Sequence, residues 1–336
     1  MNYMMNENNI KDLFKKLELH KAGVESYKVI SLPELQHKLG KTDEGYPKFF
    51  ICVNESSSQL KDIVRELLTV EYNKICRIES EKGREEKMYS IITLRSPEWT
   101  LQSSFIDIVL LMLNNMQPVP SRKELDIEVE KLITIFSAMQ NPPVKKMQGL
   151  WGELLVIDQS KYPETLINAW HKSPKAKFDF TLGKDKIEVK TTSGENRIHR
   201  FSFDQLNPSA NSQLLIASIT VRESGKGNGG KSIRNLFDSI YAKVTGCQER
   251  LRLYMIMAET IGNDINKLDS VYFDYTEAVD SLKYFRAQDI PHIEGKNVPK
   301  EVTEVKFSSN LTDVPDAFTL ECAKDYKKSP LFKSII

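Results

Sequence analysis

The stretch KFDFTLGKDKIEVKTT, residues 177–192, decides the fold of this chain. Two runs with apolar residues at alternate positions flank a Gly-Lys-Asp tip at 183–185, a pattern typical of a β-hairpin. Side chains two residues apart share a face of a strand, so Glu188 and Lys190 are expected to lie side by side. Asp179 stands on the strand before them. This placement of two carboxylates and an amine within one hairpin suggests a site as well as a fold.

The composition is that of a globular protein without an extreme charge. The chain has 336 residues, of which 28% are charged and 40% hydrophobic, and its formal net charge is +1. This length suggests two or three domains. A net charge near zero means that any affinity for nucleic acid must come from a local patch. The four cysteines show no C-x-x-C spacing, which argues against a zinc site or a disulfide framework.

The N-terminus and the hydropathy pattern indicate a cytoplasmic protein. The first residues are polar and contain no apolar core of a signal peptide. The longest apolar run, residues 108–113, is too short to span a bilayer. We therefore expect a reducing, cytoplasmic location and no membrane partner.

Periodicity along the chain predicts an α/β fold with three parts. The breaker-rich segment 117–121 separates an N-terminal α+β domain (1–120) from a core (121–265), and a small extension (266–336) packs on that core. Helices are expected at 7–20, 60–68, 101–113, 123–139, 145–159 and 232–244. Strands are expected at 48–53, 72–79, 88–94, 197–203, 214–221, 282–285 and 302–307, besides the hairpin. The N-terminal domain, 1–120, carries no chemical motif and is expected to read DNA or bind a partner.

The sequence GLWGEL at 149–154 adds a third carboxylate. Leu150, Leu154 and Ile157 form an apolar stripe at helical spacing, and the two glycines would let this helix approach a sheet closely. Glu153 lies beside that stripe, where a carboxylate is unfavourable unless it is paired or binds a ligand.

These residue types suit phosphodiester hydrolysis. The reaction needs a divalent cation to offset charge on phosphate oxygens, and it needs an activated water. Magnesium prefers one or two carboxylates together with waters and phosphate oxygens. Asp179, Glu188 and Lys190 would supply the strand half of such a site, and Glu153 the helix half.

The pattern resembles the PD-(D/E)XK nuclease superfamily, and more narrowly the PD-(D/E)XK-motif proteins of bacterial restriction-type defence clusters. The resemblance rests on GLWGEL at 149–154, Asp179-Phe180, EVKTT at 188–192, and the segment from His199 to Gln205-Leu206. It is strongest from about 145 to 240 and extends over most of the chain. Phe178 stands where the motif has a proline.

The resemblance implies a fold, a reaction and a set of roles. The core would be restriction-endonuclease-like, with a mixed central sheet flanked by helices. The chain would be a metal-dependent DNA endonuclease of a restriction-type or anti-phage system. Mg²⁺, or Mn²⁺ in its place, would be bound by Asp179 and Glu188, while Glu153 would hold a second metal or orient the first ligands. Lys190 would position the attacking water, and Gln205 would lie near Lys190 and the scissile phosphate.

The same resemblance implies partners. Besides DNA, an ATPase and a methyltransferase encoded nearby are expected to act with the chain. Restriction-type enzymes often dimerise to cut both strands, which favours a homodimer.

Each site residue also has a plain structural interpretation. A carboxylate and a lysine on neighbouring strands often form an ordinary ion pair. Ser202-x-x-Gln205 is a capping box that would start a helix. His199, for which a phosphate contact is the functional interpretation, shares a strand face with Phe201 and Phe203 and is then a packed core residue.

A second motif competes with the first. Residues 225–232, GKGNGGKS, match the phosphate-binding P-loop pattern, with an expected strand before and a helix after. Only about a hundred residues follow, which is short for a nucleotide hydrolase core. A third interpretation assigns Lys226, Lys231 and Arg234 to DNA phosphates. The alternatives to a nuclease are therefore a P-loop nucleotide-binding protein and a non-catalytic DNA- or protein-binding subunit on a nuclease fold.

Overall fold

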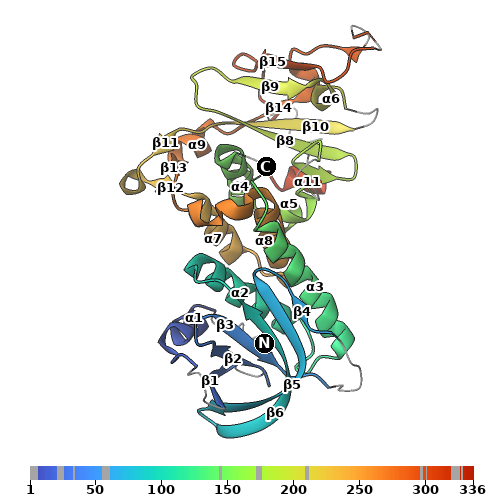
Figure 1. Ribbon diagram of the computed structural model, residues 1–336. Coiled ribbons are helices and arrows are strands. Elements are labelled where there is room, and N and C mark those ends of the chain that lie inside the picture. Colours follow the sequence, from blue (N-terminus) through green and yellow to red (C-terminus); the bar gives the residue numbers. More distant parts are fainter. Residues whose placement is uncertain are drawn as a thin grey trace. The chain divides into compact units, whose positions relative to one another are not determined.

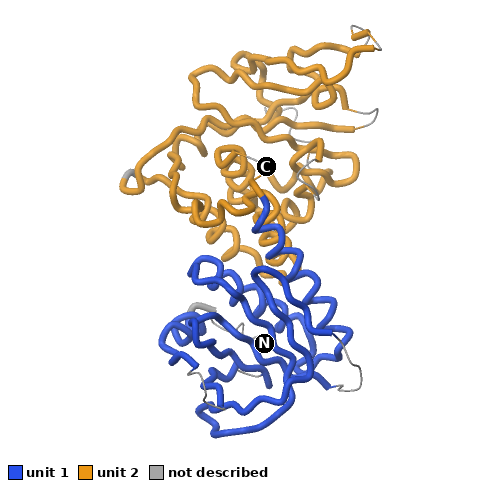
Figure 2. The backbone as a smooth tube through the Cα atoms, in the orientation of Figure 1, with its two compact units in different colours: residues 1–141 blue, residues 142–336 orange. Residues whose placement is uncertain are grey.

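The chain forms two compact units, residues 1–141 and 142–336, each described here by itself (Figure 2). The computed structural model describes residues 7–20, 26–32, 35–54, 61–143, 146–171, 176–208, 212–295, 298–299, 301–318, 326 and 328–336. Cys322 lies outside these residues. The sequence predicts three domains, with boundaries at 120 and 265, and this division stays a prediction.

Unit 1 is built on a small closed barrel (Figure 1). Its strands follow the order β1-β2-β3-β6-β5, and β1 pairs with β5 in parallel, which closes the sheet on itself. The two-residue strand β4 extends the edge of β5. The bounds are β1 Ser26–Ser31, β2 Lys38–Lys41, β3 Pro47–Ile51, β4 Ile63–Val64, β5 Leu68–Ser80 and β6 Gly83–Leu94.

Apolar side chains fill the barrel and also cover part of its outside. The interior cluster consists of Val29, Phe50, Cys52, Cys76, Ile78, Tyr89 and Ile91. On the outer face, Phe49 meets Phe105 with ring centroids 5.6 Å apart, which attaches a helix to the barrel. The helices of this unit are α1 (Glu7–Lys16), α2 (Trp99–Asn115) and α3 (Arg122–Ala138). Helix α2 is almost entirely buried, in keeping with its apolar sequence.

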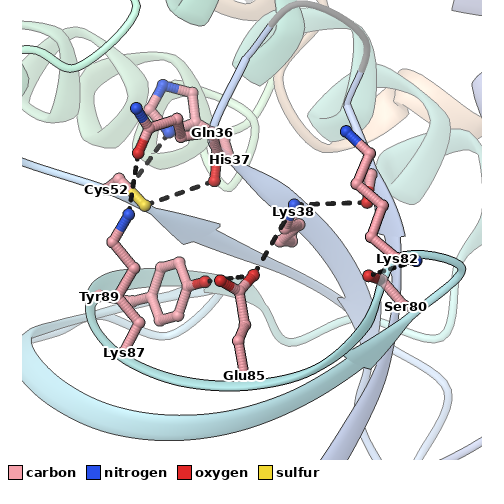
Figure 3. A network of polar contacts seen from close by, with 10 residues as sticks. Gln36, His37, Lys38, Cys52, Ser80, Lys82, Glu85, Lys87 and Tyr89 are labelled. Atoms are coloured by element: carbon pink, nitrogen blue, oxygen red, sulfur yellow. Dashed lines mark hydrogen bonds and ion pairs between the residues drawn. The ribbon is translucent and has the colours of Figure 1, made fainter.

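A network of polar side chains lies at one end of the barrel (Figure 3). The Lys87 ammonium donates to Gln36 Oε1 (2.8 Å), and the Tyr89 hydroxyl donates to Glu85 Oε1 (3.3 Å). The imidazole Nδ1 of His37 accepts from the backbone N–H of Cys52 (3.1 Å). Gln36, Glu85 and Lys87 are exposed, so this network lies at the surface of the barrel.

Unit 2 is built on a mixed four-stranded sheet of order β14-β10-β8-β7. β7 and β8 form an antiparallel hairpin, β10 runs parallel to β8, and β14 is antiparallel to β10. A separate antiparallel pair joins β9 to β15, and a small three-stranded sheet has the order β11-β13-β12. The bounds are β7 Phe180–Leu182, β8 Asp185–Thr192, β9 Ile198–Ser202, β10 Gln213–Thr220, β11 Glu223–Ser224, β12 Gly230–Lys231, β13 Tyr272–Asp274, β14 Lys283–Arg286 and β15 Lys306–Asn310.

The two faces of this sheet have different covers, as Figure 1 shows. Helices lie on one face, and the β9–β15 pair lies on the other, where Phe201, Leu206 and Leu311 pack on Ile216 and Phe285. The bounds are α4 Met147–Gln159, α5 Pro163–Ala169, α6 Phe203–Leu206, α7 Ile233–Lys243, α8 Cys247–Ile261, α9 Tyr275–Ser281 and α11 Pro330–Lys333. Short 3₁₀ turns are η1 Lys226–Asn228, η2 Gly262–Lys267 and η3 Ala287–Asp289.

Most of the elements expected from periodicity are confirmed, and the fold is mixed α/β. The helix predicted at 60–68 is wrong, since the described part of this segment contains β4 and a turn. Ile63 and Val64 pair with Val70 and Thr69, and these β-branched residues favour the strand over the helix. Among the described helices, none combines the length and the hydropathy that crossing a lipid bilayer requires.

Candidate active site

The hairpin predicted at 177–192 is present and positions the strand residues of the site. Leu182 pairs with Asp185, so that only Gly183 and Lys184 form the turn. Gly183 has φ +61°, a conformation that glycine adopts without a steric penalty. Because β8 pairs with the buried strand β10 along all eight of its residues, its register is fixed.

Glu188, Lys190 and Gln205 form one hydrogen-bonded cluster on the face of β8 that lies toward β9. The Lys190 ammonium donates to Glu188 Oε1 (2.6 Å) and to Gln205 Oε1 (3.4 Å), while Gln205 Nε2 donates to the same Glu188 oxygen (2.5 Å). Glu188 is 5% exposed, so its charge is stabilised by these partners and not by water. The Lys190 ammonium also lies 5.4 Å from the centroid of Phe201.

The Gln205 side chain joins this cluster to the start of α6. Its Oε1 also accepts from the backbone N–H of Ser202 (3.1 Å), the reciprocal half of a capping box. The capping interpretation and the proximity to Lys190 that the sequence left open are therefore both present in the structure. One amide thus starts a helix and contacts both charged groups of the site.

Asp179 lies next to the cluster, at the entrance to the hairpin. Its Oδ2 accepts from the backbone N–H of Val189 (2.8 Å), and the residue is 8% exposed. Its carbonyl accepts from the backbone N–H of His171 (2.8 Å). The Asp179 side chain is thereby bound to the residue between Glu188 and Lys190.

Glu153 has a different environment from the one expected. Its Oε2 accepts from Trp170 Nε1 (2.7 Å) and lies 3.5 Å from His171 Nε2. Helix α4 packs on the face of β8 that carries Val189 and Thr191, so the helix covers the side opposite Glu188 and Lys190. The expected convergence of Glu153 with the strand carboxylates is therefore not found, for this geometric reason.

Sequence reasoning missed Trp170 and His171. Both follow α5, and the backbone of Trp170 bridges to Phe180 at the start of β7. Trp170 and His171 are 1% and 4% exposed, respectively. They belong to no motif, and the one available signal is that two residues with ring N–H groups stand a few positions before the hairpin.

The strand carboxylates suit a divalent cation in chemistry and number. Asp179 and Glu188 are buried oxygen donors on neighbouring segments, and Mg²⁺ is commonly held by one or two carboxylates. The described ranges contain no group of three His, Cys, Asp or Glu side chains placed to hold a metal. A cation would therefore rest on these two residues and take its remaining ligands from water and substrate.

His199 is a buried residue on β9. It is 3% exposed, and its Nε2 lies 2.7 Å from Ser218 Oγ. Burial, together with the charges of Lys190 and Arg197, lowers the pKa of His199 to about 4, so the imidazole is neutral at pH 7. This environment corresponds to the packed interpretation and disfavours the phosphate contact predicted for His199.

The glycine-rich segment 225–232 folds as a ladder that differs from a phosphate-binding loop. β11 and β12 both pair with β13, with η1 between them. The backbone N–H of Ser232 donates to Asn235 Oδ1 (3.0 Å), and the N–H of Asn235 donates to Ser232 Oγ (3.2 Å). The amides that would bind a phosphate at the start of α7 are thus capped by the chain's own side chains.

The cations predicted to contact DNA in this region differ in exposure. Lys226 is exposed at the tip of the ladder. The Lys231 ammonium lies 3.3 Å from the centroid of Tyr275, and burial lowers its pKa despite the nearby carboxylate of Asp158. Arg234 is half-buried beside Phe237. DNA contact by these three residues stays a prediction, and Lys226 is the most accessible of them.

Comparison with known proteins gives one match. The search of curated proteins and the search of solved structures each returned no match. Residues 10–312 match the family described as "Putative PD-(D/E)XK family member, (DUF4420)". This range contains the hairpin, the cluster on β8 and helix α4, and it covers most of the chain, so the chain belongs to this PD-(D/E)XK family.

Proposed function

We propose that this chain is a metal-dependent DNA endonuclease with its site on the hairpin β7–β8. The observation that carries the proposal is the cluster of Glu188, Lys190 and Gln205 beside Asp179, in a chain of this family. A surface ion pair would not need this burial or a glutamine that contacts both charges. We further propose that the sheet of unit 2 is a restriction-endonuclease-like core.

The residues would divide the work of phosphodiester hydrolysis as follows. Asp179 and Glu188 would hold Mg²⁺ or Mn²⁺, which supplies charge neutralisation at the phosphate and lowers the pKa of water. Lys190 would present a positive group to the charge that develops on the phosphate oxygens. Gln205 would keep Lys190 and Glu188 in a fixed relative position. Glu153, hydrogen-bonded to Trp170, would hold the helix side of the site in place.

The test is cleavage of plasmid DNA by the full chain in Mg²⁺ or Mn²⁺. Asp179→Asn and Lys190→Ala should each reduce the cleavage rate by about a hundredfold or more, because each removes a group that acts on the transition state. Lys184→Ala is the matched control, since Lys184 is an exposed lysine in the turn of the same hairpin. Equal loss in all three variants, or cleavage that persists without Lys190, would contradict the proposal.

One observation favours a second candidate function. The absence of a three-ligand metal group in the described part of the chain, with Glu153 bound to Trp170, suits a non-catalytic DNA- or protein-binding subunit on the same fold. That subunit would bind DNA or a partner and cleave nothing in any metal. The capped start of α7 leaves the P-loop alternative without a comparable supporting observation.

The biological setting of the proposal follows from the sequence resemblance. We propose that the enzyme acts in the cytoplasm within a restriction-type or anti-phage system. An ATPase and a methyltransferase would be its partners, and a homodimer would allow cleavage of both DNA strands. Co-expression and co-purification of these proteins with the chain would test this setting separately from the chemistry.

A further inference from the structure

The barrel of unit 1 has a pocket at the end opposite the network of Figure 3. We call this pocket the barrel mouth. Its cavity measures about 250 Å³. The strand register places Lys48 of β3 and Thr93 of β6 at this end, whereas Glu85 of β6 and Cys52, directly after β3, belong to the network at the other end. The mouths of small barrels are frequent places for small ligands. The residues that line it are His20, Tyr27, Thr42, Asp43, Glu44, Tyr46, Lys48, Thr69, Glu71, Thr93 and Arg95.

Three neighbouring strands present a row of polar side chains to this mouth. Lys48 on β3, Thr93 on β6 and Thr69 on β5 lie directly opposite one another in the sheet. Lys48 lies two residues before Phe50 and Thr93 two residues after Ile91, so both share the inward face of these interior residues, and Thr69, opposite Thr93, faces inward too.

Glu71 joins this row through an irregularity in β5. It pairs with Ile91, and the register shifts between Glu71 and Lys74, with Asn73 at φ 52°. A bulge of this kind changes which side chains point to one face. Without it, Glu71 would lie on the opposite face from Cys76 and Ile78.

The buried hydroxyl of Thr93, at the mouth, lacks the partner that a buried polar group usually has. Thr93 is 5% exposed, and its hydroxyl has no hydrogen-bond partner in the described structure. Among the residues that the structure describes, Lys48 and Glu71 take part in no ion pair, although each is only half-exposed. Buried polar groups without partners are unfavourable, and a ligand that supplies the missing hydrogen bonds would relieve this.

An aromatic wall completes the mouth. The rings of His20 and Tyr27 stack with centroids 4.0 Å apart and an interplanar angle of 21°. The rings of Tyr27 and Phe50 also pack together, with centroids 5.2 Å apart, and the Lys48 ammonium lies 5.0 Å from the Tyr27 centroid. The pocket thus combines an apolar side with the half-exposed carboxylate of Glu71 and several hydrogen-bond donors, while the exposed carboxylates of Asp43 and Glu44 lie at the rim.

We propose that the barrel mouth binds a single nucleobase that carries an exocyclic amine, and this proposal rests on the proposed action on DNA. Glu71 would accept from the amine, as carboxylates do from cytosine. Lys48 and the Thr93 hydroxyl would donate to the ring nitrogen and carbonyl acceptors. A cavity of about 250 Å³ has room for one base and is smaller than pockets for drug-sized ligands.

The charges at the rim indicate how a base in DNA would enter. Arg95 is exposed at the rim and can contact a phosphate, whereas Asp43 and Glu44 are exposed acidic residues on the loop between β2 and β3. The sugar-phosphate backbone would therefore lie on the Arg95 side. A base reaches such a pocket when it is unpaired or rotated out of the duplex.

The test measures binding of fluorescently labelled DNA duplexes to the full chain in EDTA, so that no cleavage occurs. Duplexes with one unpaired cytosine are expected to bind about tenfold more tightly than those with one unpaired thymine or with full pairing, which corresponds to about 1.4 kcal/mol. Glu71→Met and Thr93→Val should abolish this preference. Thr93→Ser, which keeps the hydroxyl, and Glu86→Met, which removes an exposed glutamate beyond the mouth, should retain it.

The outcomes separate this proposal from the proposed function. Lys190→Ala should keep the base preference even though it cleaves nothing, so a failure of catalysis leaves this measurement intact. Displacement of the cytosine duplex by millimolar dCMP but not dTMP would support a base pocket that also accepts free nucleotides. Equal affinity for all duplexes, or a preference that persists in folded Glu71→Met and Thr93→Val, would overturn the proposal, and thermal unfolding of each variant verifies that it is folded.

Discussion

Replacing Gly152 with alanine should strain the contact between helix α4 and strand β8. A Cβ at this position would lie 2.5 Å from Thr191 Cγ2 and 3.4 Å from Val189 Cγ1. Ordinary carbon contacts are about 3.5–4.0 Å, so the helix or the strand must move by about 1 Å. Thr191 is β-branched and pairs with Ile219 of the buried strand β10, so it has little freedom to move aside.

The size of the effect follows from two opposing contributions. Overpacking of a core lowers the free energy of unfolding by about 1–3 kcal/mol, whereas the higher helix propensity of alanine relative to glycine raises it by about 1 kcal/mol. Gly152→Ala should therefore reduce the free energy of unfolding by about 1 kcal/mol. Gly149→Ala is the matched control in the same helix, because a Cβ there meets nothing within 4 Å. The control should be neutral or more stable by up to about 1 kcal/mol.

Denaturant unfolding followed by tryptophan fluorescence measures both variants. Trp151 and Trp170 are buried in unit 2, whereas the third tryptophan, Trp99, lies in unit 1. Because Thr191 follows Lys190, we also expect Gly152→Ala to lower the cleavage rate and Gly149→Ala to leave it unchanged. If Gly152→Ala is as stable as Gly149→Ala, the close packing of α4 on β8 is refuted.

Two further predictions concern pH and buried polar groups. Asp158 on α4 accepts from Ser239 Oγ (2.6 Å), Lys243 Nζ (2.5 Å) and Tyr275 OH (2.7 Å); burial raises its pKa, but these hydrogen bonds outweigh burial and lower it below the usual value. The ionised Asp158 therefore stabilises the fold above its unfolded pKa, near 4, and this stabilisation is lost as the pH falls through the lower folded pKa. Asp158→Asn should reduce the free energy of unfolding by about 3 kcal/mol at pH 7. It should also weaken the decrease of that free energy at acidic pH, measured by urea unfolding at a series of pH values. For His199 the folded pKa of about 4 lies below the unfolded value near 6.5, so the unfolded chain binds the proton first and stability falls from pH 6.5 to pH 4. His199→Asn should remove on the order of 3 kcal/mol of that fall, and an unchanged slope in the same urea titrations would contradict the neutral, buried imidazole.

The strand half of the site could be predicted from the sequence because it depends on local rules. Alternation along 185–192 and the glycine at 183 specify the hairpin, and a hairpin places Glu188 and Lys190 on one face whatever surrounds it. The capping box at Ser202 was equally local, and it is present.

The position of Glu153 could not be predicted because it depends on long-range packing. The sequence shows that a carboxylate lies beside an apolar stripe, but not which face of β8 the helix covers. The hydrogen bond from Trp170 joins residues 17 positions apart through a segment with no motif. The wrong helix at 60–68 has a similar cause, because pairing of β4 with β5 decides its structure.

The barrel was not predicted either. Closure requires β1 to pair with β5, and no local pattern connects paired residues such as Ser26 and Arg77, which are 51 positions apart. At residues 225–232 the sequence matches the P-loop motif, but the structure does not follow it. Pairing of β11 and β12 with the distant strand β13 gives this segment a different conformation.

The double use of Gln205 restricts what evolution can place at this position. A glutamate would preserve the start of α6 but would bring like charge against Glu188, and an alanine would lose the cap and the contact together. The asparagine side chain is one methylene shorter, so it would reach either the backbone N–H of Ser202 or the Glu188 carboxylate, but not both. A substitution at position 205 therefore changes the start of α6 and the contacts of Glu188 and Lys190 at the same time.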